Sequence, residues 1–359
     1  MDLNSLLKLL AQTKGSDLHL CAGEPPTMRV QRAIRRTRFP ELSGAEVGET
    51  LKRVAGPERW GRFLEERELD VAYVVAGVAR FRVNMYWDQD EPAACFHRIP
   101  SEVETLDELG FPPVLKEIAR LPRGIVLVTG PTGCGKSTTL AAMIDYINEE
   151  RPVHIVTIED PVEFLHRPKM ASVMQREIGI DTHSFAEALR HVMRQNPDVI
   201  LVGELRDLET IQLAITAGET GHLVFSTLHT LDAAQTIDRM VDVFESQRQE
   251  QVRAQLAITL QAVIGQDLLH RADGTGLVPA MEIMIVTPGV RNLIRERKTH
   301  QLYTLIQGGA EMGMQTFDQH LLSLYAQGTI KAEEALAKAS NPEEFARQAN
   351  IGGDREEAA

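Results

Sequence analysis

A glycine-rich stretch, GPTGCGKST at residues 130–138, has the residue spacing of a loop that binds nucleotide phosphates. The apolar run GIVLVT precedes it, and STTLAAMIDYI, which favours a helix, follows it. Gly133 and Gly135 allow the backbone to point several N–H groups at one ligand, and the helix start adds partial positive charge. Lys136 would reach the β- and γ-phosphates, and the Ser137 hydroxyl would bind Mg²⁺. The predicted ATP-binding residues are Thr132, Gly133, Cys134, Gly135, Lys136, Ser137 and Thr138.

An acidic residue follows a second apolar run, in DVILVGELRD at residues 198–207. Ligands of parallel sheets bind at the carboxyl ends of the strands, so Glu204 would lie at the ligand-binding edge. A carboxylate in that place can hold Mg²⁺ directly or through a water molecule. We therefore predict that Glu204 and Ser137 share the metal. The alternative is an ordinary solvated glutamate at the end of a strand.

Three further acids crowd the segment TIEDPVEF at residues 157–164: Glu159, Asp160 and Glu163. In a dry core they would repel one another and lose hydration, but Mg²⁺ and water at a sheet edge would tolerate them. ATP hydrolysis needs a group that orients or deprotonates the attacking water. The spacing of the three acids does not choose among them for that role.

Two histidines mark the segment GETGHLVFSTLHT at residues 218–230, with His222 at its start and His229 near its end. A separation of seven residues has no strong logic for a metal site, so two structural histidines are one interpretation. A strand end that carries Ser226, Thr227 and His229 could instead sense the γ-phosphate.

The bulk composition is that of a soluble globular protein of 359 residues, with 43% hydrophobic and 25% charged residues. No apolar run reaches the roughly 18 residues that span a bilayer, and no signal peptide is evident, so we expect a cytoplasmic protein. Three separated cysteines without a C-x-x-C pair argue against a disulfide framework and a structural zinc site.

The net charge of −13 argues against nucleic acid as a partner. The exception is a basic group in the nearly neutral first hundred residues. It is either a solvated strand face or a surface for a partner. It consists of Arg32, Arg35, Arg36 and Arg38.

The pattern along the chain predicts two domains. Residues 1–100 have the short alternating strands and helices of a small α+β domain, and the proline-flanked residues 101–113 are typical of a linker. From 114 to 350, apolar strands alternate with helices, which predicts a parallel sheet covered on both faces. The expected strands are 124–130, 153–158, 198–203 and 222–228, and the expected helices are 136–149, 184–195 and 207–217. We expect residues 231–349 to be mainly helical and residues 351–359 to form a disordered tail.

These motifs, in this order and with GVRNLIRERK at residues 289–298, resemble those of the type IV pilus retraction ATPases, twitching-motility motors of the secretion ATPase superfamily. The resemblance extends from SDLHLCAG at residues 16–23 to GMQTFDQHL at residues 313–321. Each motif alone is common, but the combination is specific.

The resemblance implies an α/β fold with a RecA-like P-loop ATPase core and a smaller N-terminal α+β domain that is PAS-like. It implies a homohexameric ring that hydrolyses ATP with Mg²⁺ and drives pilus retraction. The implied partners are an inner-membrane platform protein and, indirectly, the pilin filament. The implied location is the cytoplasmic face of the inner membrane at the pilus base.

The resemblance also assigns roles to residues of this chain. Glu163 matches the catalytic glutamate and Glu204 matches the Walker B acid, which act beside Lys136. His222 and His229 match a pair that couples nucleotide state to subunit movement. The basic stretch VRNLIRERK matches a motif needed for retraction and not for hydrolysis, although its arginines could equally form a solvated helix face.

Arginines of the N-terminal domain complete each site in the family. Arg80 and Arg82, in ARFRVN, match part of that set. In CFHRIP the family's arginine position holds His97, with Arg98 beside it. Because a shift of one residue reverses the face of a strand, Arg98 could serve as the third interface arginine only if a bulge corrected the register.

The sequence leaves four alternatives to a retraction motor open. A pilus-assembly or type II secretion ATPase usually carries an extra N-terminal domain and a four-cysteine zinc insertion, whereas this sequence begins almost at the PAS-like domain and has no paired cysteines. An accessory retraction paralogue has a similar length. A RecA-type nucleic-acid motor conflicts with the acidic charge. A nucleotide sensor would bind ATP but barely hydrolyse it.

Overall fold

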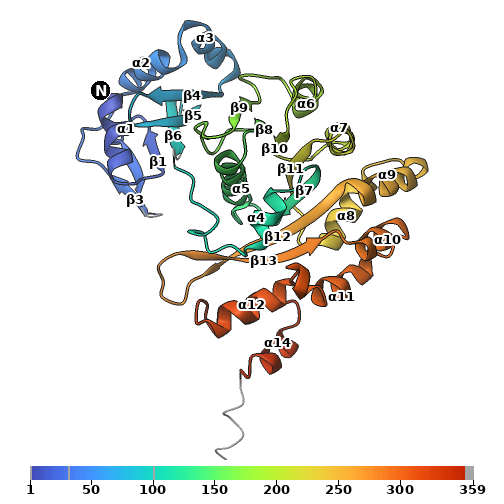
Figure 1. Ribbon diagram of the computed structural model, residues 1–359. Helices are drawn as coiled ribbons and strands as arrows, with labels where there is room; N and C mark the ends of the chain where they lie inside the picture. Colours follow the sequence, from blue (N-terminus) through green and yellow to red (C-terminus); the bar gives the residue numbers. More distant parts are fainter. Residues whose placement is uncertain (1, 31–32, 100–101, 352–359) are drawn as a thin grey trace, which may run out of the picture. The chain divides into compact units, whose positions relative to one another are not determined.

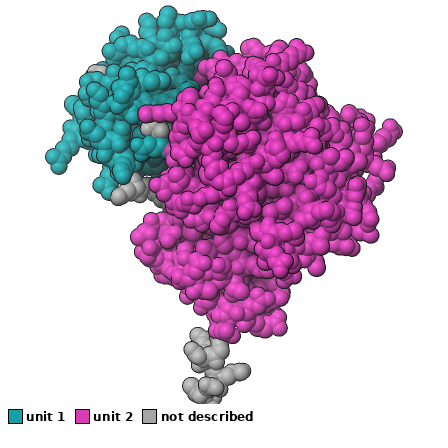
Figure 2. All heavy atoms as spheres, in the orientation of Figure 1, with its two compact units in different colours: residues 1–102, 163–165 teal, residues 103–162, 166–359 magenta. Residues whose placement is uncertain are grey.

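The computed structural model describes residues 2–30, 33–99 and 102–351, and it divides the chain into two compact units (Figure 2). The first unit comprises residues 1–102 and 163–165, and the second comprises residues 103–162 and 166–359. Most of the predicted tail lies outside the described residues, as does Arg32 of the basic group.

In its described residues, the first unit is a six-stranded antiparallel sheet with three helices (Figure 1). The strands run in the order β3-β2-β1-β6-β5-β4. Their bounds are β1 Asp17–Leu20, β2 Thr27–Val30, β3 Ala33–Arg36, β4 Leu69–Val75, β5 Ala79–Asp88 and β6 Glu91–Ile99. The predicted hairpin at residues 88–92 is confirmed by the β5–β6 pair.

The helices of the first unit are α1 Leu3–Gln12, α2 Gly44–Ala55 and α3 Pro57–Glu66. At the start of α2, the Ser43 hydroxyl accepts from the Glu46 N–H while the Glu46 carboxylate accepts from the Ser43 N–H, a capping box that fixes this end. Alternate residues of β5, Phe81, Val83 and Met85, are buried in one core with the apolar faces of these helices. Helix α3 was not predicted. Strand β3 carries Arg35 and Arg36 of the basic group, and its exposed residues agree with the interpretation of that group as a solvated strand face.

The second unit is built on a seven-stranded sheet with the order β13-β12-β7-β11-β10-β8-β9. All neighbours are parallel except β12 and β13. The strands are β7 Gly124–Thr129, β8 His154–Glu159, β9 Ser172–Glu177, β10 Val199–Val202, β11 Leu223–Leu228, β12 Leu260–His270 and β13 Leu277–Ile285.

Helices cover both faces of this sheet (Figure 1). Ile125 and Leu127 of β7 lie in a core with α6–α10, whereas Val126 and Val128 lie in a second core with α4 and α5. This two-sided burial explains why the strands are continuously apolar. The helices are α4 Val114–Ala119, α5 Lys136–Glu150, α6 Phe185–Val192, α7 Leu208–Glu219, α8 Ala233–Asp242, α9 Ser246–Thr259, α10 Pro288–Arg295, α11 Leu302–Gln307, α12 Phe317–Ala326, α13 Ala332–Lys338 and α14 Pro342–Gln348.

The expectation that residues 231–349 are mainly helical was wrong for β12 and β13. These strands form a long antiparallel hairpin, and β12 adds to the sheet beside β7. The polar residues Gln266 and Glu282 interrupt the apolar pattern, and their partners come from distant parts of the chain. An Asp-Gly turn signal at residues 273–274 was available between the two runs. Strand β9 was also missed.

Among the helices within the described residues, none combines the length and apolar character needed to cross a membrane.

Candidate active site

The glycine-rich segment joins the buried strand β7 to α5, which begins at Lys136. Gly135 precedes the helix with a φ of 89°, in the left-handed region that favours glycine. A Cβ atom on Gly130 would lie 2.2 Å from the backbone oxygen of Gln266. The sequence therefore places glycines where the loop must turn sharply and where it passes close to β12.

Lys136 is buried, and its ammonium donates hydrogen bonds to the carbonyl oxygens of Gly130 (2.8 Å) and Pro131 (2.9 Å). The side chain thus folds over the loop at the start of α5, where the partial positive charge of the helix also lies. Thr132 and Gly133 are exposed and Ser137 is half-buried. A buried cation, a helix N-terminus and a turn of glycines together fit a phosphate ligand.

Cys134 supplies backbone to the loop and keeps its thiol inside the protein, where 2% of the residue is exposed. Burial raises the pKa of the Cys134 thiol above its ordinary value. Because the thiolate is the reactive form, we expect this cysteine to be chemically inert near neutral pH.

Glu204 lies just beyond the end of β10, separated from the phosphate-loop strand by β11. Its carboxylate accepts hydrogen bonds from Arg206 (2.8 Å) and from His229 (3.1 Å). Partial burial alone would raise the pKa of Glu204, but Arg206 and His229 outweigh that effect and hold the pKa below its ordinary value. Glu204 is therefore ionised at neutral pH.

The hydroxyl of Ser137 and the carboxylate of Glu204 are hard oxygen ligands of the kind that Mg²⁺ prefers. In the described part of the chain, no group of three or more His, Cys, Asp or Glu side chains is arranged to hold a metal ion. A magnesium ion at this edge would therefore depend on phosphate oxygens and water for its remaining ligands.

The three acids of TIEDPVEF have different surroundings. Glu159 ends β8, and its carboxylate accepts from Thr157 Oγ1 (2.6 Å) and Gln175 Nε2 (3.2 Å), so it is tied to the sheet. Asp160 and Glu163 follow and are exposed. Since β8 lies next to β10, the segment leaves the sheet at the edge that carries Glu204.

The two histidines lie at opposite ends of β11. His229 follows the carboxyl end and donates to Glu204, whereas His222 precedes the amino end. His222 Nδ1 donates to the Ala217 carbonyl (3.0 Å), and its own carbonyl accepts from the Gly124 N–H (2.9 Å). A strand of this length separates its ends by about 20 Å. The structure thus brings His229 to the predicted site and leaves His222 at the far edge of the sheet.

The predicted interface arginines lie on two faces of the first unit's sheet. Arg82 pairs with His97 across β5 and β6, and Arg80 lies two residues from Arg82 on the same face. Arg98 pairs with the buried Phe81 on the other face, and its Nε donates to the Gly15 carbonyl (2.9 Å). The pairing is regular through this stretch, without the bulge that Arg98 would need, so its placement does not support a role as interface arginine.

Arg206, Gln266 and Arg291 have contacts that the sequence analysis did not foresee. Arg206 is in the same motif as Glu204 and could have been found there. Arg291, from the basic stretch of α10, donates to the Ala257 and Ile258 carbonyls (both 2.8 Å) at the end of α9. It therefore caps a helix terminus and is not simply a solvated helix face.

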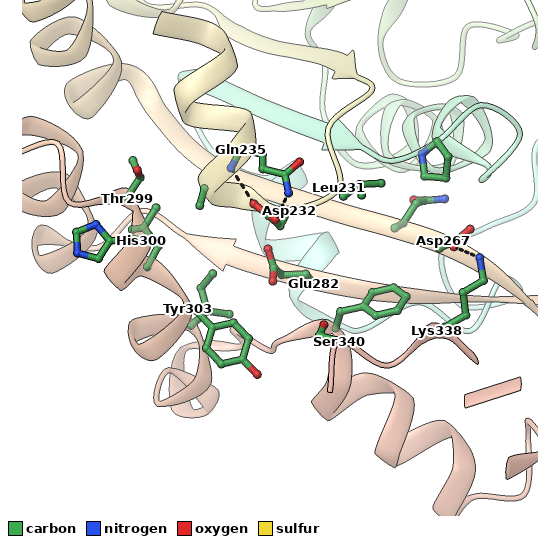
Figure 3. Close-up of a pocket in the computed structure, with 16 residues that line it drawn as sticks. Leu231, Asp232, Gln235, Asp267, Glu282, Thr299, His300, Tyr303, Lys338 and Ser340 are labelled. Atoms are coloured by element: carbon green, nitrogen blue, oxygen red, sulfur yellow. Dashed lines mark hydrogen bonds and ion pairs between the residues drawn. The ribbon is translucent and has the colours of Figure 1, made fainter. Parts of the chain in front are cut away.

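A cavity of about 430 Å³ lies in the second unit beside the phosphate loop (Figure 3). Its wall includes Pro131, Asp232 and Glu282. Glu282 is buried, and its Oε1 accepts from the Ala233 N–H at the start of α8 (2.9 Å). Burial raises the pKa of Glu282 to about 7, and the nearby Asp232 adds to the effect. This carboxyl group is therefore partly protonated at neutral pH.

Known proteins are similar to this chain over nearly its whole length. A family model described as type II/IV secretion system protein matches residues 102–275. The type IV pilus retraction ATPase PilT of Pseudomonas aeruginosa is 52% identical over 345 residues, which cover 96% of this chain and 100% of that protein. The type IV pilus ATPase PilU of the same organism is 39% identical over 354 residues, or 99% and 93% of the two chains.

A crystal structure of the pilus retraction motor PilT with bound ADP matches with a TM-score of 0.89 and 44% identity, and the match covers 97% of this chain and 99% of that one. The likeness confirms the predicted fold class, a RecA-like parallel-sheet core with a smaller N-terminal α+β domain.

Proposed function

Because the chain belongs to the family of type IV pilus retraction ATPases, within the type II/IV secretion system proteins, we propose that it is a motor that hydrolyses ATP to retract type IV pili. The observation that carries the proposal is one sheet edge that gathers the phosphate loop and the ionised Glu204, which is bonded to His229. Such an edge can bind a triphosphate and respond to the loss of its terminal phosphate.

In this proposal the phosphates of ATP bind to backbone N–H groups of residues 132–138, with Lys136 on the β- and γ-phosphates. Mg²⁺, when bound, neutralises charge on those phosphates. Ser137 would hold the ion, and Glu204 would hold it directly or through water. The low pKa of Glu204 suits that role because the carboxylate stays charged over the working pH range.

Glu163 would act as the base that polarises the attacking water. Its exposure supports this role because the carboxylate is free of the sheet contacts that hold Glu159. His229 would report the state of the γ-phosphate to Glu204 and to the loop before α8. His222 lies at the far edge of the sheet and is bonded to Ala217 of α7. This position supports a role in coupling subunit movement through α7, without contact to the nucleotide.

Six chains would form the active ring, and each site would be completed by arginines from a first unit. Arg80 and Arg82 would supply these contacts. His97 shares their face and would take the third position in place of Arg98. We infer that the ring works on the cytoplasmic side of the inner membrane, on a platform protein at the base of the pilus.

Two measurements test the proposed function. The purified chain should hydrolyse ATP with Mg²⁺ at a rate that single-stranded DNA leaves unchanged; strong stimulation by DNA would favour a nucleic-acid motor, and no hydrolysis in a single turnover would favour a nucleotide sensor. Deletion in the host should leave surface pili and abolish twitching. Cells without pili would indicate an assembly ATPase, and normal twitching would indicate that another chain drives retraction.

The identity to the retraction ATPase PilT, 52%, exceeds the identity to PilU, 39%, which is named only as a pilus ATPase; this supports a retraction ATPase over an accessory paralogue. Complementation separates the two: the gene should restore twitching to a host that lacks its PilT-like chain.

A further inference from the structure

The side chain of Gln266 connects β12 to the phosphate loop. It is buried, with 3% of the residue exposed. Its Nε2 donates to the Cys134 carbonyl (2.6 Å), and its Oε1 accepts from the Thr139 hydroxyl (2.7 Å). One amide group on a strand of the C-terminal hairpin therefore bonds both to the loop and to the first turn of α5.

The bond to Cys134 fixes the orientation of one peptide unit. In a trans peptide the C=O and the following N–H point in opposite directions. The Cys134 carbonyl points at Gln266, so the Gly135 N–H points away from β12, to the side where a phosphate would bind. Gln266 contacts no phosphate itself and acts through this peptide.

Without the bond, this peptide is free to rotate about ψ of Cys134 and φ of Gly135. Gly135, now at a φ of 89°, tolerates either sign of φ. A rotated peptide would turn a carbonyl oxygen towards the phosphates, which repel it. The native orientation would also leave the buried Cys134 carbonyl without its donor, and such a group is costly to bury.

The Cys134 carbonyl determines which end of the Gln266 amide faces the loop. A carbonyl can only accept, so the NH₂ group faces it, and the Thr139 hydroxyl donates to the remaining Oε1. The main chain at Gln266 also approaches the loop closely at Gly130. Side chain and backbone together hold β12 against the loop.

We propose that Gln266 is a positioning residue for the nucleotide site, which keeps the peptide between residues 134 and 135 in the orientation that binds phosphate. This inference rests on the proposed ATPase function and extends the site to the C-terminal hairpin, which the glycine-rich motif does not contain. Thr139 is the second member of the same network.

Titration of the full chain with Mg²⁺ and a fluorescent ADP analogue tests the proposal. Gln266→Leu should raise the Kd about tenfold, which corresponds to about 1.4 kcal/mol. Thr139→Val should raise it in the same direction, Thr139→Ser should keep the wild-type value, and the double variant should be no worse than Gln266→Leu because both changes break one network. In turnover, KM for ATP should rise more than kcat falls.

Gln315→Leu is the matched control, because Gln315 also donates from a side-chain amide to a backbone carbonyl. That carbonyl belongs to Met281, which pairs with Gln266 on β13, one strand further than β12 from the phosphate-loop strand β7. It should bind the analogue like the wild type. If the wild type does not bind, the proposed function fails. If the wild type binds and Gln266→Leu has the same Kd, or if Gln315→Leu loses as much affinity, the inference is wrong. If Gln266→Leu does not fold, the Kd values of Thr139→Val and Thr139→Ser test the proposal instead: a raised Kd for Thr139→Val alone supports it, and equal Kd values contradict it.

Discussion

At the scale of the residue, the central prediction concerns Glu163. Glu163→Gln should bind ATP with wild-type affinity and lower the turnover rate by roughly 10²–10⁴, because the amide cannot accept the proton of the attacking water. Single-turnover hydrolysis of ATP measures the chemical step. Glu159→Gln is the matched comparison, since that carboxylate is held by Thr157 and Gln175 in the sheet. Turnover near the wild-type rate for Glu163→Gln would remove this residue from the role of base.

Glu282 gives a prediction for the pH dependence of stability. Its pKa is about 7 in the folded chain against an ordinary value of 4.5, so the unfolded chain releases the proton first as the pH rises. The free energy of unfolding of the wild type therefore falls as the pH rises from about 4.5 to 7. Glu282→Gln keeps an acceptor for the Ala233 N–H and has no group that titrates, so its stability should not fall in this way. The variant should unfold in urea at higher concentration than the wild type above pH 7, by up to about 3 kcal/mol, with no gain near pH 4.5. A gain independent of pH would contradict this account.

Residue roles differ in how far the sequence could predict them. The types and spacing of Lys136 and Glu204 were enough to place them at one edge, because each follows a recognisable strand. Arg98 shows the opposite: whether it or His97 shares a face with Arg82 depends on the register of two strands, which only the paired structure fixes. The two histidines were predicted better: the expected strand at 222–228 already placed His222 and His229 at its opposite ends, and β11 confirms this.

At the scale of the element, α5 does more than begin at the phosphate loop. Near its end, Asn148 donates to the Arg167 carbonyl (2.8 Å) and accepts from the Lys169 N–H (2.9 Å). Asp145 binds the Lys169 ammonium (2.7 Å). These contacts hold the segment that leads from TIEDPVEF into β9, so one helix orders both ends of the predicted catalytic region.

Asn148→Ala should therefore destabilise the second unit by about 1–3 kcal/mol, because the buried Asn148 side chain is lost and two partly buried backbone groups lose their partner. Urea unfolding measures the change. The exposed Asn292→Ala is the control and should stay within about 0.5 kcal/mol of the wild type. Equal stability of the two variants would show that the segment does not depend on Asn148.

The elements show why local patterns predicted β7 but not β12. Strand β7 is continuously apolar and bounded by turn residues, so its pattern alone suffices. In β12 the buried Gln266 and the partly exposed Asp267 break the pattern, and their partners, Thr139 and Lys338, are remote in sequence. Whether such a strand forms depends on contacts with segments that are distant in the sequence, and a short stretch of sequence does not include those partners.

At the scale of the whole molecule, shared active sites predict that activity depends on assembly. ATPase activity per chain should fall on dilution, in step with the loss of a hexamer measured by mass. Chains with Arg80→Ala and chains with Glu163→Gln should each be inactive, and a mixture should regain part of the activity, because some sites would receive an intact arginine from one chain and an intact glutamate from the other. A fully active monomer, or a mixture as inactive as its components, would contradict shared sites.

The most direct test is a structure of the assembled chain with Mg²⁺ and a non-hydrolysable ATP analogue. The account predicts that the backbone N–H groups of residues 133–137 surround the β-phosphate and that Glu204 lies at the metal. It also predicts that the Glu163 carboxylate lies within reach of a water beside the γ-phosphate in at least one subunit. A triphosphate bound elsewhere, or Glu163 remote from the γ-phosphate in every subunit, would contradict it.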